Sequence, residues 1–243
     1  MSPFSRTIAA LYGTVVVNTS YRLAPKYKFP TAAQDTFDIL HCIIQNADTL
    51  CADPTKGFVL TGGSAGGNLA AVTAQKWRST GASPPLTGVS LMVPWLLAPE
   101  IVPEEYKELW FSREQNADAM LLDKQAMDHM FASYEPDVRS SDFSPFNAKA
   151  PHEGLPPVHI QVCGSDPLRD DGMVYEKALR AHGVKTRLDV YPGVPHGFHV
   201  FPGLELAKTA FVDTVLGIGW LLVNEKSAED VRKILPDRDW RKA

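Results

Sequence analysis

The stretch LTGGSAGGNLA (Leu60–Ala70) places one serine, Ser64, in a G-x-S-x-G pattern between two different kinds of sequence. An apolar, β-like run ends just before this serine, and an alanine-rich helical run begins at Ala65. A strand that turns sharply into a helix forces strained backbone angles on the serine and leaves little room beside it. Gly62 and Gly66 would meet that need. The pattern predicts a nucleophile elbow, although a glycine-rich turn that merely packs or cradles a phosphate can carry the same letters.

Short β-branched runs alternate with helical stretches along much of the chain, and this alternation predicts a parallel sheet covered by helices on both faces. The expected strands are Thr14–Asn18, Gly57–Thr61, Gly88–Val93, Val158–Cys163 and, near an edge, Val184–Val190. A helix is expected to begin near Thr31, where Thr31 and Gln34 have the spacing of a capping box. The fold class is α/β.

The alternation of strand-like and helical runs is interrupted between Pro94 and Pro157, in a segment rich in Met, Phe, Glu and Asp. Helical pieces are expected near Glu104–Phe111 and Asp123–Tyr134. We interpret the segment at about 96–150 as a helical cap inserted in a single domain that spans residues 1–243, with a charged tail at about 225–243. Four large side chains of this region could line a site or fill a core: Trp95, Trp110, Met120 and Phe131.

Composition excludes several classes of function. With 243 residues, 44% hydrophobic content and a net charge of −4, the chain suits one globular domain and offers no basic stripe for nucleic acid. No apolar run approaches the ~18 residues that span a bilayer. Three cysteines without a C-x-x-C pair favour a cytoplasmic location. The histidines lack the spacing of metal ligands, so neither a metal nor another cofactor is expected. The sequence does not define the oligomeric state.

A serine hydroxyl needs a base to attack a carbonyl, and the base needs an acid that orients it. Asp166 follows one predicted strand, and His196 follows the next. The order Ser, Asp, His is that of α/β hydrolases, whose ligands bind at the carboxyl ends of the strands. Asp166 could instead be a plain helix N-cap, and His199 is expected to pack or bond structurally. Asp170 and Asp171 suit a first helical turn, and Cys163 suits a buried position.

Five strings together resemble the hormone-sensitive-lipase-like family of α/β-hydrolase carboxylesterases, over about Phe4 to Val223. They are YRLAPKYKFPTAAQD (Tyr21–Asp35), GGSAGGNLA (Gly62–Ala70), SPF (Ser144–Phe146), LPPVHIQVCGSDPLRDDG (Leu155–Gly172) and HGF (His196–Phe198). The resemblance implies an α/β-hydrolase fold and a cofactor-free serine esterase. It also implies Ser64 as nucleophile, His196 as base, Asp166 as its partner and the Ala65 N–H as an oxyanion donor.

The chain departs from this family in lacking the H-G-G-G loop that supplies further oxyanion donors. The family's first strands and the N-terminal part of its cap are missing with it. One missing strand would lie between those expected at Thr14–Asn18 and Gly57–Thr61, so the sheet must have a gap or pair differently. An incomplete product of a longer gene and a short protein both remain open. Lys26 and Gly63 replace the family's usual acidic residues, which perform no proton transfer.

Three functions are therefore open. The first is a serine hydrolase that cleaves carboxylic esters of small to medium acyl chains through a Ser-His-Asp triad and an acyl-enzyme. The second is a tailoring esterase, thioesterase or acyl transferase of secondary-metabolite biosynthesis. The third is a catalytically impaired remnant or ligand-binding protein, because the H-G-G-G loop is absent. Activity should need no partner beyond a small-molecule ester.

Overall fold

The computed structural model describes residues 3–201 and 203–234. Within them, four parallel strands form one sheet in the order β1-β2-β3-β4. The strands are β1 (Val59–Gly63), β2 (Gly88–Met92), β3 (Val158–Ser165) and β4 (Thr186–Pro195). Each matches an expected run to within a few residues, and β4 lies at an edge as predicted.

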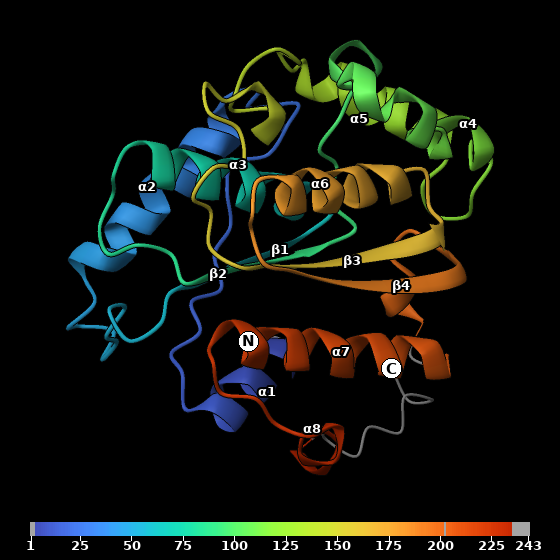
Figure 1. Ribbon diagram of the computed structural model, residues 1–243. Coiled ribbons are helices and arrows are strands. Elements are labelled where there is room, and N and C mark those ends of the chain that lie inside the picture. The colour runs from blue at the N-terminus through green and yellow to red at the C-terminus, as the bar shows by residue number, and fades with distance from the viewer. Residues whose placement is uncertain (1–2, 202, 235–243) are drawn as a thin grey trace.

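Helices cover both faces of this sheet (Figure 1). They are α1 (Pro3–Tyr12), α2 (Thr31–Gln45), α3 (Ala65–Ser79), α4 (Ser112–Gln115), α5 (Lys124–Tyr134), α6 (Arg169–Ala181), α7 (Glu205–Leu221) and α8 (Ala228–Ile234). Figure 1 shows α3 and α6 above the sheet, and α1, α7 and α8 below it. The predicted α/β-hydrolase architecture, a parallel sheet between two helical layers, is confirmed.

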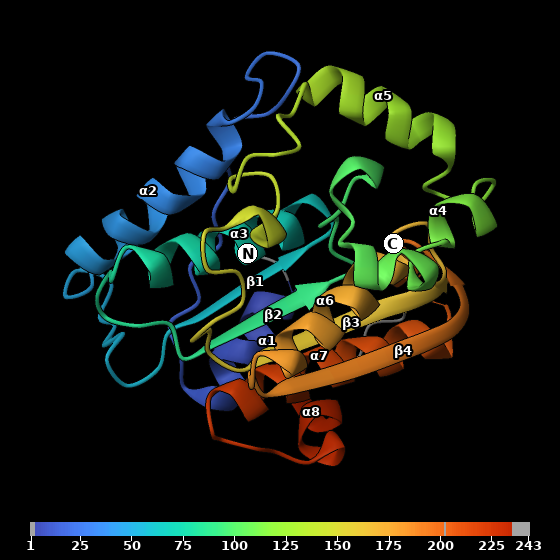
Figure 2. The same cartoon turned by 45° about the horizontal axis from the view of Figure 1, so that its top comes forward.

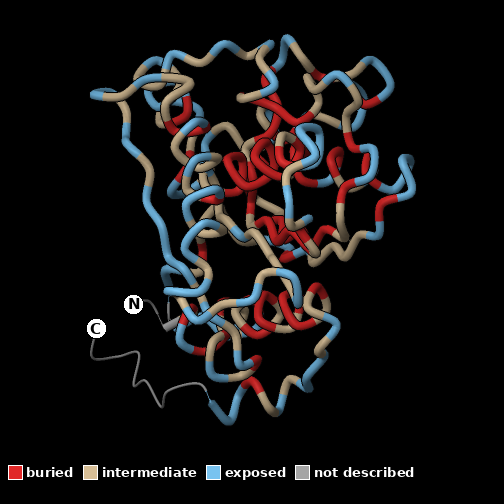
Figure 3. The backbone as a smooth tube through the Cα atoms, turned by 90° about the vertical axis from the view of Figure 1, so that its left-hand side faces the viewer, coloured by how far each residue is buried: buried red, intermediate tan, exposed pale blue. Residues whose placement is uncertain are grey.

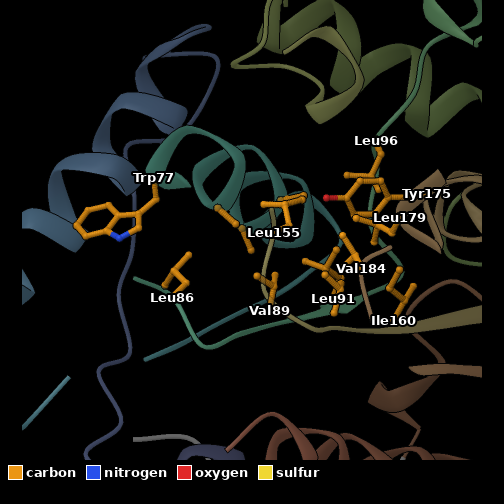
Figure 4. Close-up of a cluster of buried hydrophobic side chains, with 14 of the residues drawn as sticks. Trp77, Leu86, Val89, Leu91, Leu96, Leu155, Ile160, Tyr175, Leu179 and Val184 are labelled. Carbon is orange, nitrogen blue, oxygen red and sulfur yellow. The ribbon is translucent and has the colours of Figure 1, made fainter. Parts of the chain in front are cut away.

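The main core lies between the sheet and the upper helices, where Leu91, Ile160 and Val162 are fully buried. Figure 4 shows Leu179 of α6 close to Leu91 and Ile160, while Trp77 of α3 lies at the other end of the same cluster, near Leu86. A parallel sheet buried on both faces requires nearly continuous apolar strands, which explains why these runs alternate so little. Burial is concentrated in the sheet and the helices beside it, as Figure 3 shows.

The lower face depends on a close approach between α7 and the sheet. A Cβ added to Gly217 would lie 2.2 Å from the His159 ring of β3, so only glycine fits at this crossing. On the far side of α7, the Tyr12 hydroxyl of α1 donates to the carbonyl of Val215 at 2.8 Å. Val231 of α8 is buried in the same layer. Part of the predicted charged tail is therefore a packed helix, while residues 235–243 lie outside the described residues.

The segment between β2 and β3 carries α4, α5 and short 3-10 turns. Figure 2 shows α4 and α5 above the sheet, toward the carboxyl ends of the strands. Asp123 caps α5 by accepting from the N–H of Ala126 at 2.7 Å. The helix expected at Glu104–Phe111 is a 3-10 turn over Glu104–Leu109, followed by α4.

Two expectations about local structure were wrong. Thr14–Asn18 is not a strand, because no described strand lies beside it to form a ladder. It is part of an extended connection from α1 below the sheet to α2 above it, with Val15 and Val17 about half exposed. Among the described strands the sheet does not re-pair, and β1 is the strand at its other edge. Thr31 is the first helical residue of α2 rather than its cap, since Pro30 occupies the cap position without a side-chain bond.

No described helix combines the length and apolar character needed to cross a membrane.

His152 is a buried histidine without a hydrogen-bond partner for its Nδ1 atom. Its ring packs among Phe146, Tyr175 and His182, with a centroid distance of 5.3 Å to the His182 ring. Burial, together with a smaller contribution from the nearby His182, lowers the pKa of His152 from 6.5 to about 4. In acid the unfolded chain therefore binds a proton that the folded protein resists.

We predict that stability falls as the pH drops from 6.5 toward 4, by up to about 1.4 kcal/mol per unit from this group. Denaturant unfolding at pH 7 and pH 5 should show the wild type losing about 2 kcal/mol more than His152→Asn. Asparagine tolerates the positive φ of 68° at this position. Equal losses in both proteins would contradict the prediction.

Candidate active site

Ser64 lies on the turn between β1 and α3, as the predicted elbow requires. Its φ of 55° and ψ of −119° are strained for a residue with a side chain. The flanking elements fix this backbone conformation, because β1 ends at Gly63 and α3 begins at Ala65. The Ser64 N–H also donates to the carbonyl of Met92 at 2.8 Å, which ties the turn to β2.

The glycines around Ser64 differ in what they allow. A Cβ on Gly62 would lie 2.1 Å from the carbonyl oxygen of Gly66, so the turn cannot close with any larger residue there. Gly67 is also tight, because its Cβ would approach Pro94 at 3.1 Å. Gly66 has open space at that position, and the expectation that it must be glycine for lack of room was wrong. The G-x-S-x-G spacing does not indicate that Gly67 also has little room for a side chain.

The register between β3 and β4 brings Asp166 and His196 together. The two strands pair Ser165 with Pro195, so the next residue of each chain segment lies beside its neighbour. His196 Nδ1 lies 2.8 Å from Asp166 Oδ2, and His196 Nε2 lies 2.9 Å from Ser64 Oγ. All three predicted side chains thus form one hydrogen-bonded chain at the carboxyl ends of the strands.

The Asp166 and His196 side chains differ in burial in a way that suits proton transfer. The Asp166 carboxylate is fully buried, and the His196 side chain is 13% exposed. Asp166 Oδ1 also accepts from the N–H of Leu168 at 2.8 Å, so both carboxylate oxygens are engaged. An ionised carboxylate is acceptor-only, so we assign the Nδ1 proton to His196 and leave Nε2 free to accept from Ser64. Asp166 is not the N-cap of α6, because Leu168 occupies that position.

Ala65 is the first residue of α3, so its N–H has no partner within the helix. It lies directly after the serine, at the positive end of the helix dipole. An oxyanion formed on a carbonyl carbon attacked by Ser64 would lie near this N–H.

Two other reactive residues near the site, His199 and Cys163, are enclosed by neighbouring parts of the protein. The His199 ring packs on Phe198 at 4.4 Å, and its enclosed Nε2 has no partner in the described part of the chain. Burial lowers the pKa of His199, and His196 nearby lowers it further. Cys163 is fully buried in β3, and burial raises the pKa of its thiol. An inert buried cysteine was predicted there.

A cavity of about 540 Å³ opens on Ser64 and His196. Its walls come from the chain before α2, from α3 and from the segment between β2 and β3 that contains α5. They include Tyr21, Leu69, Trp95, Leu122, Phe131, Tyr134 and Phe143. Of the four aromatic and sulfur side chains left undecided from the sequence, Trp95 and Phe131 line this cavity. Trp110 packs in a core cluster, and Met120 is 68% exposed.

Polar groups in the cavity are few. Burial raises the pKa of Tyr134 to about 12 and also raises the pKa of Tyr21, so both phenols stay protonated near neutral pH. The Asn68 amide donates to the carbonyls of Trp95 and Phe143, both at 2.7 Å, and so fixes two wall segments. Sequence reasoning missed Asn68 and both tyrosines, because no local pattern shows which distant segments share a cavity. Within residues 3–201 and 203–234, no group of three metal-ligating side chains gathers.

We predict that Gly62→Ala lowers the free energy of unfolding by more than about 2 kcal/mol, because its methyl group collides with backbone. Gly66→Ala is the matched control, since a methyl group there meets nothing within 4 Å. Helix propensity should leave that variant unchanged or more stable by up to about 1 kcal/mol. Urea unfolding measures both. Equal stability of the two variants would contradict the geometry.

Residues 1–200 match a protein family described as alpha/beta hydrolase fold. An AB hydrolase superfamily protein of Schizosaccharomyces pombe is 42% identical over 220 residues, covering 90% of this chain and 65% of that protein. The versiconal hemiacetal acetate esterase of Dothistroma septosporum is 36% identical over 217 residues, covering 88% of this chain and 66% of that protein.

The solved structure of vibralactone cyclase matches with a TM-score of 0.80 and 40% identity, covering 84% of this chain and 60% of that chain. This chain therefore spans just under two thirds of the length of these relatives. The resemblance carried by the five sequence strings is confirmed, and the chain belongs to the hormone-sensitive-lipase-like family of α/β-hydrolase carboxylesterases.

Proposed function

We propose that this protein is a serine hydrolase that cleaves carboxylic esters through an acyl-enzyme. The observation that carries the proposal is the series of hydrogen bonds from Ser64 through His196 to Asp166, with Ser64 and His196 lining a largely apolar cavity. A hydroxyl, an imidazole and a buried carboxylate in this order form the arrangement that activates a serine. Membership of a carboxylesterase family supports the same assignment.

In the proposed reaction, Ser64 Oγ attacks the ester carbon while His196 Nε2 accepts the hydroxyl proton. Asp166 holds the Nδ1–H of His196 and stabilises the imidazolium that forms. The tetrahedral intermediate collapses as His196 returns the proton to the leaving alkoxide, which departs as an alcohol. Water then attacks the acyl-enzyme with His196 again as base, releasing the acid and regenerating Ser64.

The oxyanion of each tetrahedral intermediate would accept a hydrogen bond from the Ala65 N–H. Removing one donor from an oxyanion hole typically costs roughly 10²–10³ in kcat, so the number of donors determines the rate. The H-G-G-G donors of the family are absent from this sequence.

The substrate would be an ester with a small to medium apolar acyl chain. Aliphatic and aromatic side chains form most of the cavity wall, and its volume of about 540 Å³ is within the usual range for small-molecule sites. We propose that the segment at about 96–150 is the cap of a single domain, because Leu121, Leu122 and Phe131 line this cavity. A cytoplasmic location stays a prediction.

A tailoring esterase or acyl transferase of secondary metabolism is the second candidate. The names of two relatives favour it, since one is a versiconal hemiacetal acetate esterase and the other a vibralactone cyclase. The same acyl-enzyme could pass its acyl group to an alcohol instead of water. Comparing oxygen esters with thioesters, and measuring transfer to an added alcohol, separates this candidate from simple hydrolysis.

We predict that Ser64→Ala lowers kcat for p-nitrophenyl butyrate by roughly 10⁴-fold or more, since the nucleophile is removed. Ser133→Ala is the matched control, because Ser133 lines the same cavity but takes no part in the hydrogen-bonded chain. That control should retain activity within about threefold of the wild type. If Ser64→Ala hydrolyses the ester at the wild-type rate, the assignment of Ser64 is wrong. If the folded wild type is inert, the protein is an impaired remnant or a binding protein.

A further inference from the structure

The turn that carries Asp166 is held by a side chain from α4, far away in sequence. Asn116, just after α4, donates from Nδ2 to the carbonyl of Asp166 at 3.0 Å and approaches the carbonyl of Gly164 at 3.5 Å. Ser112, the first residue of α4, donates from Oγ to the carbonyl of Pro167 at 2.7 Å. Both ends of α4 therefore contact the backbone on either side of the buried acid.

The position of α4 is fixed in turn by two carboxylates at the start of α6. Asp170 Oδ2 accepts from the N–H of Phe111 at 2.8 Å and from that of Ser112 at 2.6 Å. The Ser112 hydroxyl accepts from the N–H of Asp170 at 3.2 Å, which closes a reciprocal pair. These residues are paired so closely that α4 and the Asp166 turn form one hydrogen-bonded unit.

Asp171 anchors the same unit from inside the protein. Its fully buried carboxylate accepts from the indole N–H of Trp110 at 2.8 Å and from Arg113 Nη2 at 2.9 Å. The N–H groups of Leu96 and Leu97 donate to it at 2.8 and 2.9 Å. Asp171 lies in the first turn of α6, as expected from the sequence. It also binds two separate parts of the insert.

The strand ladder ends just before Asp166. The register between β3 and β4 is irregular between Cys163 and Ser165, and β3 ends at Ser165. Beyond that point the carbonyl of Asp166 accepts from the N–H of Arg169 in its own turn and from Asn116. Asn116 is thus the contact that ties this carbonyl to a part of the chain outside its own turn. A misplacement of about 1 Å in a reacting constellation can cost 10²-fold in rate.

We infer that Asn116 is a positioning residue for the proposed reaction, acting through Asp166 to hold His196 in line with Ser64. The inference rests on the proposed function, because it concerns the same hydrogen-bonded chain. Asn116 touches none of the three side chains that react. The insert that forms part of the cavity wall through α5 thereby also sets the position of the acid.

Asn116→Ala removes the amide donor, and Asn116→Asp keeps the shape while replacing the donor by an acceptor. Both should lower kcat for p-nitrophenyl butyrate by roughly 10- to 100-fold and leave KM within about twofold. Asn147→Ala is the matched control, because Asn147 also donates from Nδ2 to two insert carbonyls, those of Val138 and Ser140. Its kcat should change less than about twofold, at a similar loss of unfolding free energy.

A double-mutant cycle with Asp166→Asn tests the route of the effect. If Asn116 acts through Asp166, Asn116→Ala should change kcat less than about twofold in the Asp166→Asn background. An equal loss in both backgrounds would overturn the inference, as would an unchanged kcat in Asn116→Ala. A loss in Asn147→Ala that equals the loss in Asn116→Ala would assign the effect to general stability.

A second readout needs no turnover. The proton of the His196 Nδ1–H bond to Asp166 gives a downfield NMR signal, which should persist in Asn147→Ala and shift or vanish in Asn116→Ala. An unchanged signal in both variants overturns the inference even if the wild type proves inert. Failure of the proposed function is recognised separately, by the activity of Ser64→Ala.

Discussion

The parallel register of β3 and β4 is the constraint on which the site depends. It pairs Ser165 with Pro195 and so sets a carboxylate and an imidazole side by side at the ends of two strands. The strained turn at Ser64, bonded to β2 through Met92, completes the row from a third strand end. A one-residue slip between β3 and β4 would turn His196 away from Asp166, because neighbouring residues in extended chain face opposite sides.

The sequence predicted which three side chains the fold brings together, because each of them lies in a short motif with a local cause. The sequence alone contains the G-x-S-x-G pattern, places Asp166 and His196 after two apolar runs, and has the order Ser, Asp, His. The errors arose where the cause is not local. The β-branched run at Thr14–Asn18 lacks a neighbouring strand, and Gly66 has space that no spacing rule reveals. Asn116 could not be found, since its role depends on how the insert folds back onto the Asp166 turn.

The insert between β2 and β3 joins two parts of the proposed mechanism. One side of it forms the cavity wall through Phe131 and Leu122, and another binds the acid-bearing turn through α4. Two buried carboxylates, Asp170 and Asp171, hold these parts together. Leaving a buried carboxylate without its donors costs several kcal/mol, so this connection resists rearrangement.

The proposed function requires that the Ser64 hydroxyl is an activated nucleophile in the folded protein. Fluorophosphonate labelling followed by peptide mapping tests it most directly, because phosphonylation requires an activated serine but not the release of an acyl group. We expect one adduct per chain, located on Ser64, and little adduct when His196 is replaced by alanine. Folded protein that takes up no label, or carries it on another serine, would show that Ser64 is not the activated nucleophile.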